Sequence, residues 1–152
     1  MRLYLVRHGK AEEGRNDDLR RLSARGRDDI RRLGEWCRRK GIDPAEIWHS
    51  PKVRARETAT LLAGLIDCPG GAVEREGLLP EDDPGSVAEL LDSAEGDLCI
   101  VSHLPFVGLL AGHLARDSMH LEFSTSSMWC ALRAADGAWT TEWFVSPKSL
   151  EE

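Results

Sequence analysis

The chain has 152 residues, of which 41% are hydrophobic and 30% are charged, and its formal net charge is -6. This length and balance are typical of one globular domain with a buried core. The acidic net charge argues against non-specific nucleic-acid binding, and no segment reaches the roughly 18 consecutive apolar residues of a membrane span. The apolar start is too short and too soon charged for a secretory signal, so we expect a cytoplasmic protein without nucleic-acid or membrane partners.

The first predicted element is a strand that ends on two basic residues. Its run Leu3 to Val6 has no polar position, which is typical of a strand covered on both faces. Arg7 and His8 follow at its carboxyl end, the edge where ligands bind in open α/β sheets. On this stretch alone, a solvated arginine and a surface histidine explain the sequence equally well.

The next element is a helix within "RLSARGRDDIRRLGEWCRRKG", with Ser23 as its N-cap and Gly41 as its stop. Ile30, Leu33 and Cys37 form its apolar stripe. The many arginines of this segment point elsewhere. We interpret them as a solvated surface, and a docking surface for an acidic partner is the alternative.

Strands and helices then alternate almost to the end of the chain. The pattern predicts a strand at 45–50, a helix at 52–66, a weak strand at 72–79, a helix at 84–94, a strand at 97–102, a helix at 106–115, and a hairpin of strands at 127–135 and 138–146. The apolar positions of the second helix are Val53, Leu61, Leu62 and Leu65. This alternation predicts a single-domain three-layer α/β/α sandwich with a mostly parallel central sheet.

The four cysteines are widely spaced and form no CxxC pair; they are Cys37, Cys68, Cys99 and Cys130. This spacing indicates neither a zinc site nor a disulfide framework. We expect reduced cysteines that serve in packing.

Two further strand ends carry basic residues. Arg54 begins the helix after the strand at 45–50, and His103 follows the strand at 97–102. If these strands neighbour the first, Arg54 and His103 converge with Arg7 and His8. Two guanidinium groups would repel a metal ion, so this set predicts an anion site, and arginine forks suit the oxygens of a phosphoryl group.

Four ordered motifs carry a resemblance to a known family. They are RHG at 7–9, LSxxG at 22–26, SPxxRAxxT at 50–58 and SHLP at 102–105. The chain resembles the histidine phosphatase superfamily, which has the phosphoglycerate mutase-like fold, and within it the small bacterial phosphohistidine phosphatases of the SixA type. Lys10 and His49 depart from the family's usual residues, which bears on substrate choice more than on chemistry.

The resemblance implies a role for each site residue. A neutral His8 would attack phosphorus and form a covalent phosphohistidine that water hydrolyses. Arg7, Arg54 and His103 would bind the phosphoryl oxygens, and Gly9 would let the backbone pass close to the phosphate. The cationic neighbours should lower the pKa of His8. Neither a metal nor another cofactor is expected.

Chain length bears on the substrate. Fewer than fifty residues separate Arg54 from His103, so we expect one histidine phosphatase domain over residues 1–152 without a cap insertion. Such an open site can accept a phosphohistidine on a signalling protein, and a small phosphate ester is the alternative. A phosphomutase needs a more closed pocket. A noncatalytic phosphopeptide-binding module would not need His8 in the attacking position.

The general acid is the least defined part of the site. The loop "LLPEDDPGSV" offers Asp83 first and Glu81 second, and the equal alternative is a solvated turn and helix N-terminus. We interpret His113 and His120 as structural or solvated, whereas His49 either lines the rim of the site or serves the turn that follows it.

Overall fold

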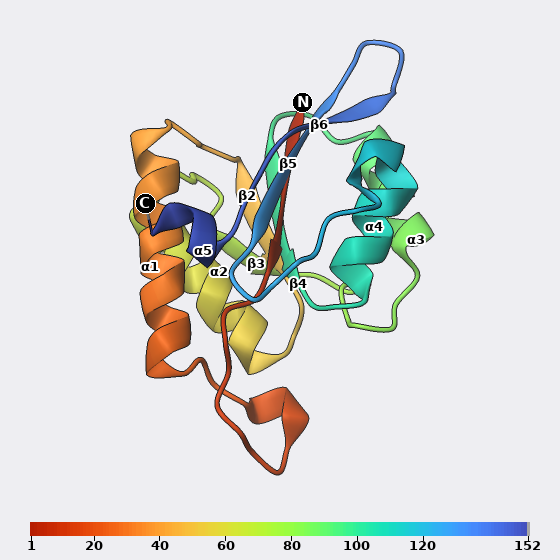
Figure 1. Ribbon diagram of the computed structural model, residues 1–152. Coiled ribbons are helices and arrows are strands. Elements are labelled where there is room, and N and C mark those ends of the chain that lie inside the picture. The colour runs from red at the N-terminus through yellow and green to blue at the C-terminus, as the bar shows by residue number, and fades with distance from the viewer. Residues whose placement is uncertain (152) are drawn as a thin grey trace.

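The computed structural model describes residues 1–151 as a six-stranded sheet between two layers of helices (Figure 1). The strands are β1 (Arg2–Arg7), β2 (Glu46–His49), β3 (Ala72–Glu74), β4 (Leu98–Ser102), β5 (Met128–Arg133) and β6 (Trp139–Val145). The helices are α1 (Ala24–Arg39), α2 (Val53–Leu65), α3 (Pro84–Asp92), α4 (Phe106–Leu114) and α5 (Pro147–Leu150), with short 3-10 turns η1 (Asp17–Leu19) and η2 (Arg116–Ser118).

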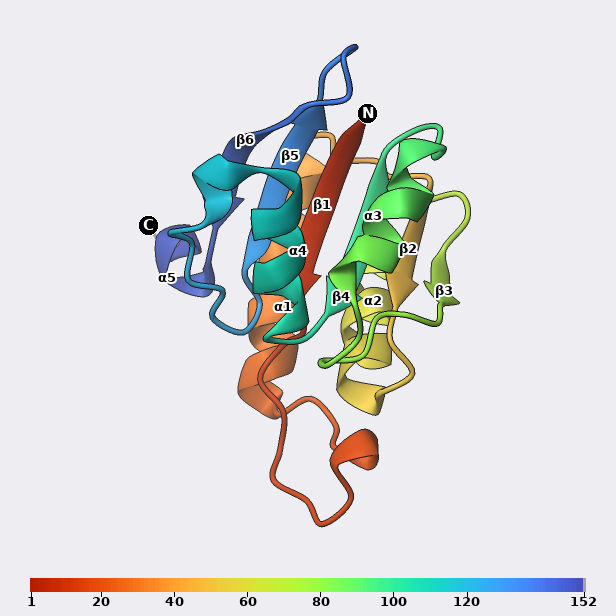
Figure 2. The ribbon, with the colours of Figure 1, turned by 90° about the vertical axis from the view of Figure 1, so that its right-hand side faces the viewer.

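The sheet has the order β3-β2-β4-β1-β5-β6, which Figure 2 shows from the side of α3 and α4. Strands β3, β2, β4 and β1 pair in parallel. Strand β5 pairs antiparallel with β1, and β6 pairs antiparallel with β5 at the edge of the sheet. The predicted three-layer sandwich with a mostly parallel sheet is confirmed. Because β1 and β4 are parallel neighbours with Arg7 opposite Ser102, the residues that follow both strands emerge together.

The two faces of the sheet bury separate cores. Leu3 and Leu5 of β1 pack with α3 and α4, whereas Tyr4 and Val6 pack with α1 and α2. Burial on both faces explains why β1 and β4 read as continuous apolar runs. The four cysteines are free, and all except the half-buried Cys68 lie inside this packing.

Helix α1 begins and ends at the predicted signals. The Ser23 hydroxyl accepts a hydrogen bond from the Gly26 N–H at 3.0 Å, and Gly41 has a φ of 71°, a left-handed conformation that glycine adopts readily. Ile30, Leu33 and Cys37 are fully buried, as predicted. The arginine-bearing sides of the helix are half-buried or exposed.

The buried face of α2 differs from the predicted apolar stripe. Of the four predicted positions only Leu62 is buried; Val53, Leu61 and Leu65 are half-buried. The buried set is instead Arg54, Ala55, Thr58, Ala59 and Leu62. Small residues let the helix pack closely on the sheet, and the polar members turn toward the edge where the strands end. The helix predicted at 52–66 is confirmed, although its large apolar residues do not by themselves define its buried face.

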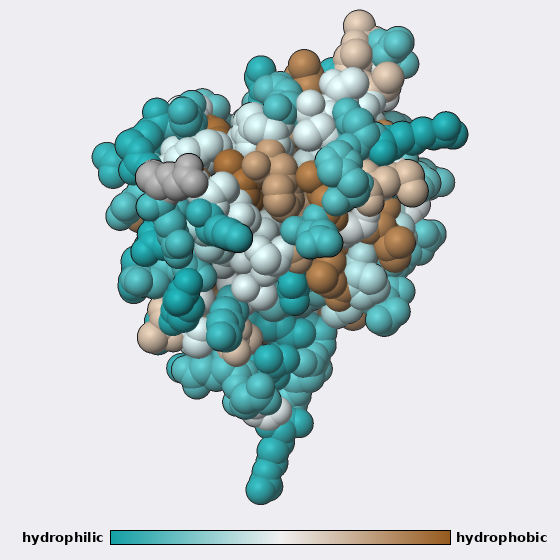
Figure 3. Space-filling model, viewed as in Figure 1, coloured by the Kyte–Doolittle hydropathy of each residue, from teal (hydrophilic) through white to brown (hydrophobic). Residues whose placement is uncertain are grey.

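Three short elements were absent from the predicted pattern: η1, η2 and α5. None has an apolar stripe, and η1 and α5 contain no buried residue. The segment that carries η1 projects below the carboxyl edge of the sheet (Figures 1 and 2). In the same orientation, this lower end of the molecule is almost entirely hydrophilic (Figure 3). Within residues 1–151, no helix has the length and apolar character to cross a membrane.

Candidate active site

The candidate site lies where β1, β2 and β4 end. His8 follows β1, Ser50 follows β2 and His103 follows β4. The centroids of the His8 and His103 rings are 4.9 Å apart. The Nε atom of Arg54, in the first turn of α2, lies 3.3 Å from Nε2 of His8. The structure thus brings together the residues that the strand ends and the first turn of α2 predicted to meet.

The His8 ring is held in one orientation by its neighbours. Its Nδ1 lies 2.7 Å from the Gly9 carbonyl oxygen, an arrangement that places the imidazole proton on Nδ1. Its Nε2 then carries a lone pair and accepts the hydrogen bond from Arg54. Because the backbone N–H of His8 also donates to the Ser102 carbonyl at 3.0 Å, His8 is anchored to β4.

Burial keeps the His8 imidazole neutral. The side chain is nearly enclosed, and desolvation lowers its pKa from 6.5 to about 4, with the positive charges of Arg54 and Arg7 acting in the same direction. The hydrogen bond with Gly9 opposes this shift without cancelling it. At pH 7 the imidazole ring is therefore neutral and carries a lone pair on Nε2.

Gly9 is fixed by packing as much as by the site. A Cβ here would come 3.0 Å from side-chain atoms of Ile30 and Leu22, so a larger residue would require these side chains to shift. Its N–H donates to the Thr58 hydroxyl at 3.0 Å, and that hydroxyl donates to the Arg54 carbonyl at 2.8 Å. The Gly9 N–H is therefore already occupied by a protein acceptor. These two hydrogen bonds link the residue after β1 to the first turns of α2.

Arg7 and His103 each have a buried nitrogen without a partner. Nη1 of Arg7 donates to the Phe123 carbonyl at 3.0 Å, but its Nε has no acceptor. Nε2 of His103 shares a 2.6 Å hydrogen bond with the Ser50 hydroxyl, but its Nδ1 is unpaired. Burial, then the neighbouring His8 and Arg54, lower the pKa of His103 to about 3. The neutral ring is therefore free to place a proton on Nδ1.

Unpaired buried polar atoms gather around this edge of the sheet. Within residues 1–151 they are Arg7 Nε, His103 Nδ1 and the hydroxyl of Ser126, whose backbone N–H bonds the Arg7 and His8 carbonyls. Leaving such a group unsatisfied costs about 1–3 kcal/mol. Donors that lack acceptors beside a buried arginine fit a bound anion.

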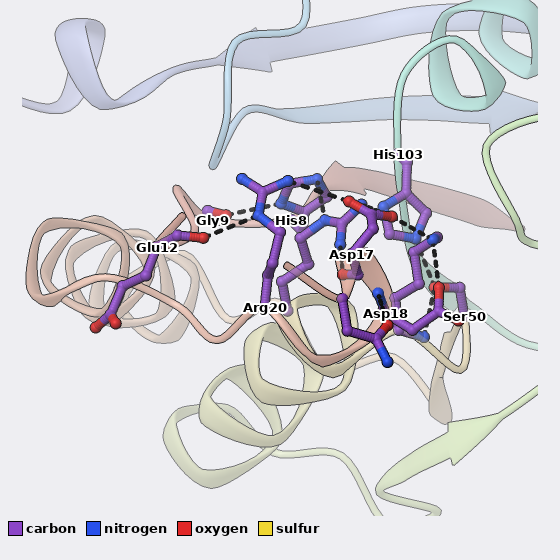
Figure 4. A network of polar contacts seen from close by, with 11 residues as sticks. His8, Gly9, Glu12, Asp17, Asp18, Arg20, Ser50 and His103 are labelled. Carbon is purple, nitrogen blue, oxygen red and sulfur yellow. Dashed lines mark hydrogen bonds and ion pairs between the residues drawn. The ribbon is translucent and has the colours of Figure 1, made fainter. Parts of the chain in front are cut away.

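Asp17 of η1 is the carboxylate that contacts this set. Its carbonyl accepts from Arg54 Nη1 at 2.8 Å and its Oδ2 from Nη2 at 3.3 Å. Lys52 Nζ and Arg20 Nη1 bind the same carboxylate, and Lys52 also binds Asp18 (Figure 4). The hydrogen bond from Lys52 and then that from Arg20 hold the pKa of Asp17 well below its usual range. The arginine that faces His8 is thus partly neutralised by an exposed loop.

Sequence reasoning did not find Asp17, Arg20 or Lys52. Asp17 and Arg20 lie in a polar stretch without periodicity, where the local signal is Asn16, which caps η1 by accepting from the Asp18 N–H at 3.1 Å. Lys52 is the first residue of the helix predicted at 52–66 and one of the unspecified positions of the motif at 50–58. Such a cap predicts a turn but not what the turn approaches.

The two predicted acid candidates lie on the loop before α3. Asp83 is the N-cap of that helix, and its carboxylate accepts from the Gly85 N–H at 3.0 Å. Glu81 is exposed and lines a pocket with Lys52 and Leu79. The alternative interpretation, a turn and helix N-terminus, accounts for Asp83.

The remaining histidines differ in surroundings. His49 is buried and its Nδ1 lies 2.8 Å from the Ser50 carbonyl, so it braces the turn that leads to α2. His113 and His120 are exposed. Within residues 1–151, no three His, Cys, Asp or Glu side chains form a group that could hold a metal ion.

Comparisons with known proteins identify the family and the fold of the chain. The chain is 27% identical to the phosphohistidine phosphatase SixA of Escherichia coli (strain K12) over 156 residues, covering 99% of this chain and 97% of that protein. The solved structure of the protein histidine phosphatase SixA complexed with tungstate superposes with a TM-score of 0.91 at 27% identity, covering 99% of both chains. A putative SixA structure from Agrobacterium tumefaciens, 21% identical and covering 96% of this chain and 97% of that one, shares the fold with a TM-score of 0.81. The model of the histidine phosphatase superfamily (branch 1) matches residues 3–90, more than half of the chain, and the protein therefore belongs to that superfamily.

Proposed function

We propose that this protein removes the phosphoryl group from a phosphohistidine on a partner protein, through a covalent intermediate on Nε2 of His8. The observation that carries the proposal is the neutral His8, whose Nε2 lone pair accepts a hydrogen bond from the buried Arg54, a bond that Arg54 must release when Nε2 attacks phosphorus. Similarity to proteins named as phosphohistidine phosphatases supports the choice of substrate. The protein partner and a cytoplasmic location stay predictions.

In the first step, the Nε2 lone pair of His8 forms a bond to phosphorus while the bond from phosphorus to the substrate's imidazole nitrogen breaks. The electron pair of that bond stays on the departing imidazole, which leaves neutral when protonated. In the second step, water attacks the phosphorus on His8, which releases inorganic phosphate and restores the lone pair on Nε2. Two moderate barriers thereby replace one high barrier.

We assign the phosphoryl oxygens to Arg7, Arg54 and His103. Phosphoryl transfer depends mainly on positioning and charge stabilisation, which buried guanidinium groups supply. The unpaired Arg7 Nε and His103 Nδ1 are available donors. Arg54 must exchange part of its contact with Asp17 for contact with the phosphoryl group, because its Nη2 binds that carboxylate.

The placement of the carboxylates favours P–N over alkyl P–O substrates. An alkoxide leaving group needs a positioned acid, which contributes about 10²- to 10⁴-fold in rate. Asp83 is engaged as a helix cap, and Asp17 is held ionised by its cationic partners. A protonated imidazole leaves without such an acid.

We further propose one domain without a cap insertion, since α2 and β4 are linked by only β3, α3 and their loops.

The test compares a phosphohistidine peptide with an alkyl phosphate ester in wild-type protein and in Asp83→Asn and Glu81→Gln variants. We expect the peptide to be hydrolysed at least 100-fold faster than the ester, with little change in either variant. Efficient ester hydrolysis that collapses in one variant would identify a dedicated acid and favour a small-molecule phosphomonoesterase.

A further inference from the structure

A second pocket, of about 540 Å³, lies beside the candidate site. Its walls come from Asp18 of η1, from Pro51 and Lys52 before α2, and from residues 79–82 between β3 and α3. All three segments lie at the carboxyl edge of the sheet (Figure 2). The pocket therefore opens on the same edge as His8.

One residue separates the pocket from the predicted phosphate-binding groups. Lys52 lines the pocket, while its Nζ binds the Asp17 carboxylate that also contacts Arg54. Pro51 follows Ser50, whose hydroxyl is hydrogen bonded to His103. The pocket is therefore connected to the candidate site through Lys52 and through the Ser50–Pro51 segment.

The pocket combines an apolar wall with negative charge. Pro51, Pro80 and the partly exposed Leu79 supply the apolar surface. The carboxylates are those of Asp18, Glu81 and Asp82, against the single ammonium group of Lys52.

The ion pairs leave the pocket with a net negative charge. Lys52 is engaged by Asp17 and Asp18, whereas Glu81 and Asp82 appear in none of the ion pairs of residues 1–151. Asp82 accepts the Leu79 N–H at 2.9 Å, which fixes the turn that carries these carboxylates along the pocket wall. The neighbouring site has the opposite sign, because the guanidinium groups of Arg7 and Arg54 lie there against the carboxylate of Asp17.

We propose that this pocket binds the side chain next to the phosphohistidine of the protein substrate, and that it selects an apolar residue followed by lysine or arginine. The inference rests on the proposed function, because it names the sequence around the phosphohistidine. A phosphorylated segment with a basic neighbour is negative at one end and positive at the other, which matches the two adjoining surfaces. An acidic neighbour would meet Glu81 and Asp82 and be disfavoured.

The experiment uses two phosphohistidine peptides that differ only in the flanking residues, Leu-Lys in one and Leu-Glu in the other. N-phosphoimidazole, which has no flanking residue, reports on the chemistry at His8 alone. Surface charge pairs are worth little individually, so two carboxylates predict a preference of about fivefold in kcat/KM for the lysine peptide.

Leu79→Lys places a positive charge in the pocket without altering a residue of the candidate site. We expect it to abolish the preference between the peptides and to leave N-phosphoimidazole turnover within about twofold of wild type. Leu79→Ala should slow both peptides to the same extent, because it removes apolar contact and no charge. Leu109→Lys, at an exposed leucine on α4 that lines no part of this pocket, is the control for an added surface lysine and should retain the preference.

Equal rates for the two peptides in wild-type protein, or a preference that survives Leu79→Lys, would overturn the inference while N-phosphoimidazole turnover still supported the proposed function. Failure of the proposed function looks different, because neither the peptides nor N-phosphoimidazole would then be hydrolysed.

Discussion

The buried ring of candidate residues and the loop that carries Asp17 are built in different ways. His8, Arg54 and His103 are nearly inaccessible and are held by backbone carbonyls, by hydroxyl groups and by register between parallel strands. Segment η1 buries no residue, and its approach to the site depends on ion pairs made by Asp17 and Asp18.

This contrast separates two tasks. Hydrogen bonds inside a low-dielectric core fix geometry, whereas an ion pair whose carboxylate is exposed to water is weaker and exchanges more readily, as for Asp17 and Asp18 against the largely buried Lys52 and Arg54. The buried ring is suited to hold the nucleophile in one orientation. The η1 loop is suited to yield to an anion that competes for Arg54 and Lys52. The predictions below test each half of this comparison.

The largest effect is expected at the buried ring. Arg54→Ala removes the guanidinium group that faces Nε2 of His8, so developing charge on the phosphoryl oxygens loses a stabilising partner. We predict a loss of about 10²- to 10³-fold in kcat together with weaker vanadate binding. Turnover and vanadate inhibition measured on the same preparation check it, and unchanged vanadate affinity would remove Arg54 from the site.

A substitution in the η1 loop is expected to strengthen anion binding, by a smaller factor than the loss expected at Arg54. Asp17→Asn removes the charge that competes for Arg54 and Lys52, and keeps the backbone carbonyl that bonds Arg54 Nη1. Affinity for inorganic phosphate should rise about fivefold, measured by calorimetry at low salt. Asp18→Asn is the matched control, because Asp18 pairs with Lys52 alone. It should raise the affinity for inorganic phosphate by less than Asp17→Asn does. Weaker phosphate binding in Asp17→Asn would show instead that this carboxylate orders Arg54.

The pKa of His8 shows whether its imidazole side chain is buried or exposed. Its pKa of about 4 means that it gains a proton only in acid, whereas an ordinary histidine titrates near 6.5. The unfolded chain binds that proton first, so stability present above pH 6.5 should be lost as the pH falls toward 4. Histidine NMR titration, with His8→Ala to assign the signal, measures the pKa. A midpoint above 6 would contradict the burial argument.

The smallest effect is expected from metal removal. The guanidinium groups of Arg7 and Arg54 supply the positive charge that a cation would otherwise provide, so we predict unchanged turnover after dialysis against a strong chelator. A loss of activity that a divalent metal restores would contradict this prediction and direct attention to His49 and His113.

The sequence predicted the fold well because its signals were strong. The apolar strands β1 and β4, the capped helix α1 and the closing hairpin each carry a pattern that survives tertiary packing. The meeting of Arg7, His8, Arg54 and His103 followed from one rule, that neighbouring parallel strands end at a shared edge.

What the sequence did not predict depends on contacts rather than patterns. The buried face of α2 is set by Arg54 and Thr58, which turn toward the site at the expense of apolar residues. Asp17 reaches Arg54 through a 3-10 turn without a buried residue, so no periodicity marks it. The position of Asp83 in an acidic loop makes it a candidate acid, yet its carboxylate caps α3 by accepting from the Gly85 N–H.

The central claim is that Nε2 of His8 carries the phosphoryl group during turnover. The direct measurement is to mix the protein with a radiolabelled phosphohistidine peptide, quench in base within milliseconds, and map the label on the protein. We predict an acid-labile, base-stable phosphoryl group on His8 that is absent from His8→Ala, a variant that still binds vanadate through its arginines. Label on another residue, or full turnover by His8→Ala, would contradict the covalent mechanism.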